Sequence, residues 1–146
     1  AVGQWGAILH YDGRQWRADL GADDLSKATL LRAVWGSSWS DVFVAGDGGL
    51  ILHRSGGRWV SELSGAREDL RRLWGTGPTD VWAGGGAEPP GRASALLHFD
   101  GQSWSRVGTG TGRLALFGLF GSEREDRGGR VFAVGAAGGV LRFRGY

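Results

Sequence analysis

The sequence predicts an all-β protein, a β-propeller built from about 3.3 four-stranded repeats of roughly 40–45 residues. Three observations support this fold class. A motif recurs at spacings of 43 and 45 residues, each repeat holds four short apolar segments, and glycine-rich turns separate the segments. A β-sandwich of about 12 strands is the alternative, but a sandwich does not require near-identical units at a fixed spacing.

The first and second strands of each unit are expected in two repeated blocks. The first block reads LRAVWG at 31–36, LRRLWG at 70–75 and LFGLFG at 116–121. The second block reads DVFVAG at 41–46, DVWAGG at 80–85 and RVFAVG at 130–135. These blocks are rich in valine, leucine and aromatic residues and are too short for independent helices, so they are typical of strands.

The third and fourth strands are expected in a repeated hairpin. It reads GAILHYDGRQW at 6–16, GLILHRSGGRW at 49–59 and SALLHFDGQSW at 94–104, and GGVLRFRGY at 138–146 follows the same pattern. The pairs Asp12-Gly13, Gly56-Gly57 and Asp100-Gly101 favour tight hairpin turns between the two strands.

Residues 1–146 are interpreted as one repeat domain, with a partial unit at 1–20, full units at 30–63 and 70–107, and a partial unit at 116–146. Strands from 116–135 and 7–20 would together make a third blade, which leaves one strand, 139–144 or 7–11, in surplus. Propellers typically have four to eight blades. We therefore expect the ring to be completed by a second copy, by edge-strand pairing with a neighbour, or by a longer parent chain.

Composition argues against several classes of function. The chain has no cysteine, which excludes disulfides, zinc–thiolate sites and cysteine nucleophiles. The net charge is +2, and the arginines are scattered among acids, which argues against nucleic-acid binding. No run of 18 apolar residues is present, so no membrane span is expected. The lack of methionine suggests a processed or excised form.

The residues most suggestive of catalysis recur at fixed positions of the repeat. His10, His53 and His98 share one position of the third strand, so we interpret them as structural and expect no metal site, cofactor or catalytic residue. Asp41 and Asp80 open the second strand and are expected to cap a turn by accepting backbone N–H bonds.

Aromatic residues recur in three sets, which we expect to form the core between blades. The sets are Trp16, Trp59 and Trp104; Trp35, Trp74 and Phe120; and Phe43, Trp82 and Phe132.

Residues that interrupt the repeat are the candidates for binding. In propellers the loops between second and third strands and between successive blades share one face, where ligands usually bind. Trp5, Asp47, Glu88 and Arg92 are expected on that face and form the predicted binding patch.

The pattern WGS…DVFVAGDGGLILHRSGGRW at 35–59 resembles the Gly/Trp-rich propeller repeats of large secreted proteins of myxobacteria. It is also distantly similar to Asp-box (BNR-type) propellers, in which an Asp–Gly turn followed by tryptophan closes a hairpin. Asp12-Gly13 with Trp16 and Asp100-Gly101 with Trp104 fit that motif, whereas the middle copy has Ser55 and every copy lacks the serine or threonine that opens a full Asp-box.

The resemblance implies fold more than activity, and it implies a secreted or cell-envelope location. The function expected is a non-catalytic, structural or protein-interaction propeller that self-assembles through its blades, with other proteins or glycans as further partners. The alternative is a lectin-like, glycan-binding propeller. An Asp-box glycosidase is least favoured, because it needs carboxylates in the central pocket, where the first strands offer Arg32, Arg71 and Arg72 but no acids.

Overall fold

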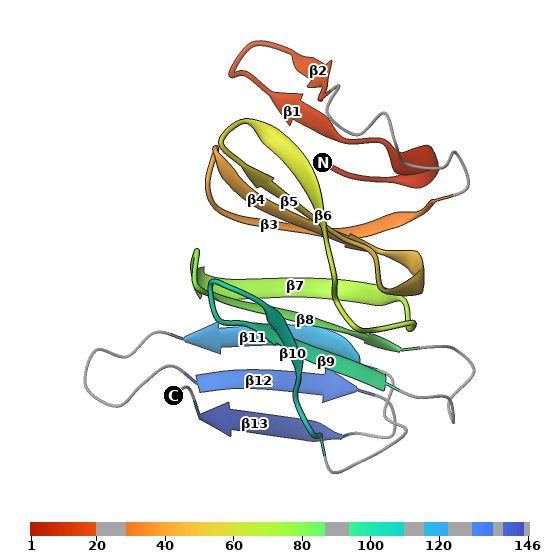
Figure 1. Ribbon diagram of the computed structural model, residues 1–146, viewed down its shortest axis with the longest axis vertical. Coiled ribbons are helices and arrows are strands. Elements are labelled where there is room, and N and C mark those ends of the chain that lie inside the picture. Colours follow the sequence, from red (N-terminus) through yellow and green to blue (C-terminus); the bar gives the residue numbers. More distant parts are fainter. Residues whose placement is uncertain (20–28, 87–93, 110–115, 123–129, 136–138, 145–146) are drawn as a thin grey trace.

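The computed structural model describes residues 1–19, 29–86, 94–109, 116–122, 130–135 and 139–144. These residues form antiparallel strands and two single-turn 3₁₀ segments, which confirms the all-β prediction. Four sheets follow one another in chain order as a stack, with the N-terminal sheet at one end and the C-terminal sheet at the other (Figure 1). Within the described part of the chain, no helix has the length and apolar character needed to cross a membrane.

Each sheet is a run of consecutive antiparallel strands. The first sheet pairs β1 (Leu9–Tyr11) with β2 (Trp16–Ala18). The second sheet has β3 (Leu31–Ser38), β4 (Asp41–Gly46), β5 (Ile51–Ser55) and β6 (Arg58–Glu62). The third has β7 (Leu70–Gly77), β8 (Asp80–Gly86), β9 (Ser94–Phe99) and β10 (Trp104–Arg106). The fourth has β11 (Leu116–Ser122), β12 (Arg130–Gly135) and β13 (Val140–Arg144).

The expected blade made from 116–135 and 7–20 is wrong. β12 pairs with β13, while β1 and β2 pair with each other at the opposite end of the stack, so these strands do not close a ring (Figure 1). The physical reason is chain connectivity. β13 follows β12 closely in the sequence, whereas pairing β12 with β1 would close a loop of about 120 residues at a greater cost in entropy.

A row of three residues crosses each of the last three sheets at the same register. The rows are Trp35–Phe43–His53, Trp74–Trp82–His98 and Phe120–Phe132–Arg142. In the second sheet the row faces the third sheet, where Phe43 packs against Phe99 and Trp104. In the third sheet the row faces the fourth, where Trp82 lies against Phe143. In the fourth sheet, the face that carries the row Phe120–Phe132–Arg142 forms the end of the stack.

Successive sheets are in contact where an aromatic ring from the first strand of one sheet packs against a glycine in the first strand of the next sheet. A Cβ atom placed on Gly75 would lie 2.8 Å from Cη2 of Trp35, and one placed on Gly121 would lie 2.1 Å from Cη2 of Trp74. A side chain at either glycine would therefore collide with the ring. We call this the aromatic-on-glycine contact.

The predicted aromatic core is confirmed inside the stack and wrong at its ends. Phe43 and Trp82 are buried, and Trp59 and Trp104 pack against the clusters between sheets. Trp16 and Phe120 are exposed, because among the described residues no further sheet lies beyond the faces that carry them.

Candidate functional site

The predicted binding patch is present in part. Trp5 lies in the turn η1 (Gln4–Gly6) and Asp47 opens the turn η3 (Asp47–Gly49), and each turn leads into the third strand of its unit. The two turns flank the start of β3, because the Gly6 amide donates to the Thr29 carbonyl and the Asp47 amide to the Leu30 carbonyl. The other two predicted residues, Glu88 and Arg92, lie outside the described residues.

Trp5 has an unusual backbone conformation. It is 75% exposed and has a φ of 58°, whereas the equivalent position in η3 is Gly48 with a φ of 64°. A bulky residue in this left-handed region is disfavoured by about 1–2 kcal/mol, and glycine is not. Trp5 therefore combines a strained backbone with a ring that contributes little to the core, which is a pattern found at functional sites.

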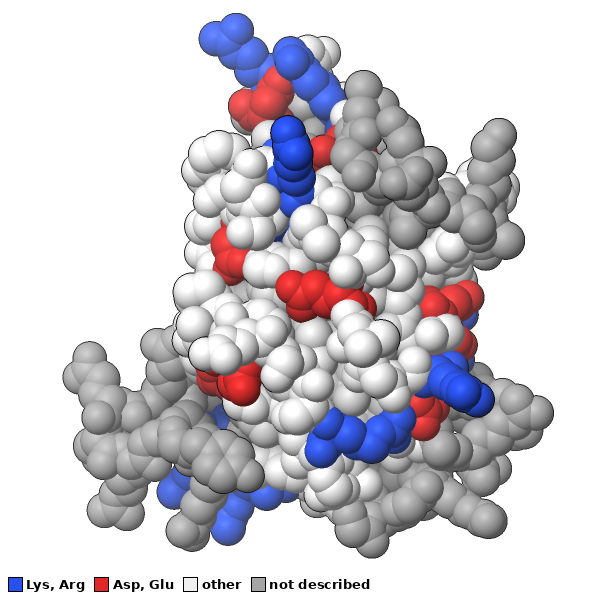
Figure 2. All heavy atoms as spheres, in the orientation of Figure 1, with Lys and Arg blue, Asp and Glu red and all other residues white. Residues whose placement is uncertain are grey.

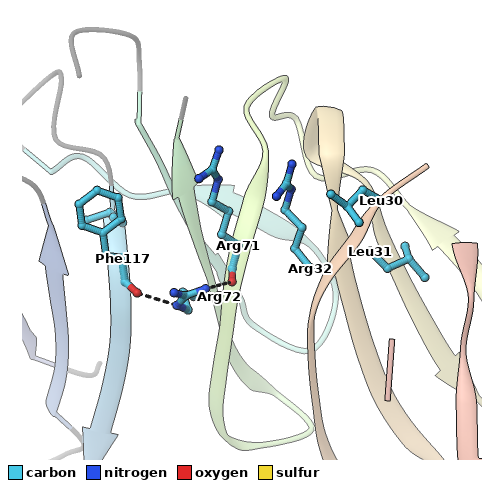
Figure 3. A pocket seen from close by; sticks show the side chains of 7 residues that line it. Leu30, Leu31, Arg32, Arg71, Arg72 and Phe117 are labelled. Carbon is cyan, nitrogen blue, oxygen red and sulfur yellow. Dashed lines mark hydrogen bonds between the residues drawn. The ribbon is translucent and has the colours of Figure 1, made fainter. Parts of the chain in front are cut away.

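Arginines from the first strands line a cleft of about 370 Å³. The lining residues are Leu30, Leu31, Arg32, Arg71, Arg72, Leu116 and Phe117. Figure 3 shows Arg32 and Arg71 extending side by side from β3 and β7, while Arg72 turns toward the Phe117 carbonyl. Nε of Arg72 donates to that carbonyl at 2.6 Å, which ties β7 to β11.

Two acids that sequence reasoning did not place in the cleft neutralise its arginines. Asp47, the predicted binding residue, accepts a hydrogen bond from Nε of Arg32. Asp69 lies just before β7, and its Oδ2 is 3.7 Å from Nη2 of both Arg32 and Arg71. Its Oδ1 accepts from the Gly48 amide at 3.1 Å. These carboxylates hold turns against strands rather than standing free in the cleft, so the arrangement does not resemble a glycosidase acid–base pair.

The repeated histidines and aspartates form hydrogen-bonded groups within each sheet. Nε2 of His53 lies 2.7 Å from Asp41 Oδ1, and the Ser37 hydroxyl donates to the other Asp41 oxygen. In the next sheet Nε2 of His98 lies 2.8 Å from Asp80 Oδ1, and the Thr76 hydroxyl donates to Asp80 Oδ2 at 2.6 Å.

These groups contain the residue types of a hydrolase triad in a different order. A nucleophilic hydroxyl must donate to the histidine, which the carboxylate then orients from the other side. Here the aspartate lies between the hydroxyl and the histidine, so Ser37 and Thr76 donate to a carboxylate and not to the histidine. The expectation that Asp41 and Asp80 cap backbone N–H groups is corrected, because their oxygens accept from these side chains. No group of three His, Cys, Asp or Glu side chains among the described residues could hold a metal ion.

One of these groups continues into the next sheet. Nδ1 of His53 lies 2.8 Å from Glu62 Oε1, and Nε1 of Trp104 donates to Glu62 Oε2 at 2.6 Å. The His53 ring also stacks on Phe43, with ring centroids 3.9 Å apart. His53, which the sequence analysis considered as a possible metal ligand, is therefore part of a hydrogen-bonded group that joins the second and third sheets.

The hairpin aspartates stabilise their own turns. Asp12 Oδ1 accepts from the amides of Arg14 and Gln15, and Asp100 Oδ1 accepts from those of Gln102 and Ser103. Backbone hydrogen bonds, with that of Gln15 the largest for Asp12 and that of Ser103 for Asp100, hold the pKa of both carboxyls below the usual value. The Asp–Gly motif thus has a structural role in both hairpins.

Charge is dispersed over the surface. In the view of Figure 2, acidic and basic side chains are interspersed, and much of the surface over the middle sheets is uncharged. That face offers no continuous basic track of the kind that follows a phosphate backbone.

The most distinctive surface is one that sequence reasoning missed. The end of the stack formed by β11, β12 and β13 exposes Phe120, Val134 and Val140, with Phe132 and Arg142 on the same face. We call these five residues the terminal face. The signal in the sequence was the position of Phe120, which matches Trp35 and Trp74 but belongs to the last unit.

No family model matches this chain, and comparisons with curated proteins and with solved structures give no significant match either. The resemblance to myxobacterial and Asp-box propellers stays a prediction from the sequence.

Proposed function

We propose that the protein is a non-catalytic structural and interaction module of the β-propeller type, which associates with further copies of itself through its blades. The observation that carries this proposal is the terminal face. Phe120 is 66% exposed there, whereas Trp35 and Trp74, at the same position of the preceding sheets, are partly buried. Exposed apolar patches of this kind mark interaction sites.

The chemistry of the described residues supports a non-catalytic function. Each repeated His–Asp group is part of the sheet scaffold, and the cleft arginines bind acids or carbonyls of the same chain. These polar groups are engaged in contacts within the fold, which supports the apolar terminal face as the surface for function.

A concentration series of sedimentation velocity on matched variants tests the proposal. Phe120→Ser should move the protein toward monomer, because it removes the main exposed ring of the terminal face. Leu63→Ser is the matched control, since Leu63 is 91% exposed but lies just after β6, away from that face. Equal sedimentation of Phe120→Ser and the unmodified protein would contradict the proposal.

Glycan binding is the second candidate, and the conformation of Trp5 favours it. Exposed tryptophan rings offer a flat apolar surface on which the C–H face of a sugar can stack, and strain retained at an exposed site suggests selection for function. A glycan array with the unmodified protein and a Trp5→Gly variant tests this candidate. Binding that is lost in the variant would support it, and an empty array would leave self-association as the better account.

A further inference from the structure

We infer that the terminal face of one copy docks head-to-tail on the second sheet of another copy, beside its N-terminal sheet, placing Phe120 against Gly36. This inference rests on the proposed function and deepens it, because it names the surface that receives the terminal face. That surface is the side of β3 and β4 that carries Val34 and Gly36, and we call it the receiving face.

The aromatic-on-glycine contact is the first argument. It occurs twice inside the chain, from Trp35 to Gly75 and from Trp74 to Gly121. Among the described residues, the same series leaves one aromatic residue without a glycine to pack on and one glycine without an aromatic ring. Phe120 is the next aromatic and is exposed, and Gly36 is the preceding glycine and is exposed. The three heavy atoms nearest to a Cβ atom placed on Gly36 belong to its own hairpin, to Ser38, Asp41 and Val42.

A second contact between sheets, from Gly84 to Leu119, also has exposed counterparts on the terminal face and the receiving face. A Cβ atom on Gly84 in β8 would lie 3.1 Å from Cδ1 of Leu119 in β11. The counterpart of Gly84 in the fourth sheet is Val134, and the counterpart of Leu119 in the second sheet is Val34. Val134 is 43% exposed and Val34 is 45% exposed. Docking that buries Phe120 on Gly36 would bury this pair as well.

The terminal face and the receiving face are therefore complementary to each other rather than to themselves. Face-to-face docking of two terminal faces would set Phe120 against an identical ring and leave Gly36 uncovered. Head-to-tail docking repeats the register of an interface that the chain already forms twice, with Phe120 in the place of a tryptophan and Val134 in the place of Gly84. Such a heterologous contact builds a closed ring or an open filament, depending on the rotation between copies.

The N-terminal sheet limits how the second copy fits. β1 and β13 are both third strands of their units, and Ile8 just before β1 packs with Val44 and Leu52 of the second sheet. Once the terminal face has docked, β13 of the same chain and β1 of the second copy compete for the one position beside β12. Docking therefore exchanges β13 for β1 of the second copy, which gives a shared sheet in the order β11, β12, β1 and β2. The part of the terminal face that makes the contact is then Phe120, Phe132 and Val134 on β11 and β12, because Val140 and Arg142 leave with β13.

Cysteine cross-linking tests the docking direction, and the absence of native cysteine makes every engineered thiol unique. Val34→Cys and Val134→Cys proteins are prepared separately, mixed and oxidised, with a Leu63→Cys and Val134→Cys mixture as the control. The Val34→Cys with Val134→Cys heterodimer should exceed the control by roughly tenfold or more, because docked thiols meet at an effective concentration near the millimolar range.

The other outcomes overturn the inference in distinguishable ways. Cross-linking of Val134→Cys mainly with itself shows face-to-face docking, so self-association stands and the head-to-tail inference fails. Background cross-linking together with a monomeric mass in solution removes the proposed function too. Hydrogen exchange adds a check on strand exchange, because amides of 140–144 should exchange faster in the assembled protein than in a monomeric Phe120→Ser variant. Unchanged protection there would contradict the exchange of β13 for β1.

Discussion

Nε1 of Trp104 donates a hydrogen bond of 2.6 Å to Glu62 Oε2, across the boundary between the second and third sheets. Because the other oxygen of Glu62 binds His53, one carboxylate joins a ring of each sheet. The equivalent tryptophan one unit earlier, Trp59, has a buried Nε1 with no hydrogen-bond partner among the described residues. Trp59 is therefore a matched control for Trp104, because the two residues occupy the same position of the repeat and differ in whether Nε1 has a hydrogen-bond partner.

Trp104→Phe should destabilise the protein more than Trp59→Phe. Both substitutions shrink a ring, but only Trp104→Phe removes a donor from a charged acceptor, which typically costs roughly 1.5–3 kcal/mol. Urea unfolding followed by circular dichroism gives both free energies. Equal losses would show that the bond to Glu62 contributes nothing to the junction between sheets.

Gly121→Ala should destabilise by about 1–3 kcal/mol, because the added methyl would lie 2.1 Å from the Trp74 ring. Gly77→Ala is the control, since a Cβ atom there meets nothing within 4 Å. Thermal unfolding of the two variants measures the difference. A Gly121→Ala protein as stable as the control would show that the aromatic-on-glycine contact does not constrain the stack.

Acid should destabilise the hairpins through Asp12 and Asp100. Their pKa values in the folded protein are lower than the ordinary value of 3.8, so their stabilising effect is complete above that value. The effect is lost as the pH falls below about 4 and through the folded-state pKa. Asp100→Asn keeps an oxygen acceptor for the turn but removes the titration. Its melting temperature should fall less steeply with acid than that of the unmodified protein, and parallel curves would contradict the assignment.

Trp5→Gly should leave stability unchanged or raise it by up to about 1 kcal/mol, because glycine adopts a φ of 58° without strain. Differential scanning calorimetry measures the change. A clear loss of stability would mean that the Trp5 ring contributes to folding, and the case for a ligand at this position would then weaken.

Local pattern predicted the strands well, because repeated blocks such as LRRLWG carry both the apolar residues of a strand and the glycine on which the aromatic ring of the preceding sheet packs. The pairing of the terminal strands could not be predicted in this way. Residues 7–11 and 139–144 carry the same pattern, and only chain connectivity decides which one lies beside β12.

The candidate sites were harder to predict, because they depend on neighbouring sheets. Asp69 precedes β7 without any motif, yet it pairs with two arginines of the cleft. Phe120 has the sequence of a core residue and becomes a surface residue only because its sheet ends the stack.

The mass of the unmodified protein in solution, measured by light scattering over a wide range of concentration, tests the central claim most directly. The chain has a mass of 15.5 kDa. Association through the terminal face predicts a mass that rises with concentration to a multiple of that value. A well-folded protein that stays at 15.5 kDa throughout the range would contradict the claim.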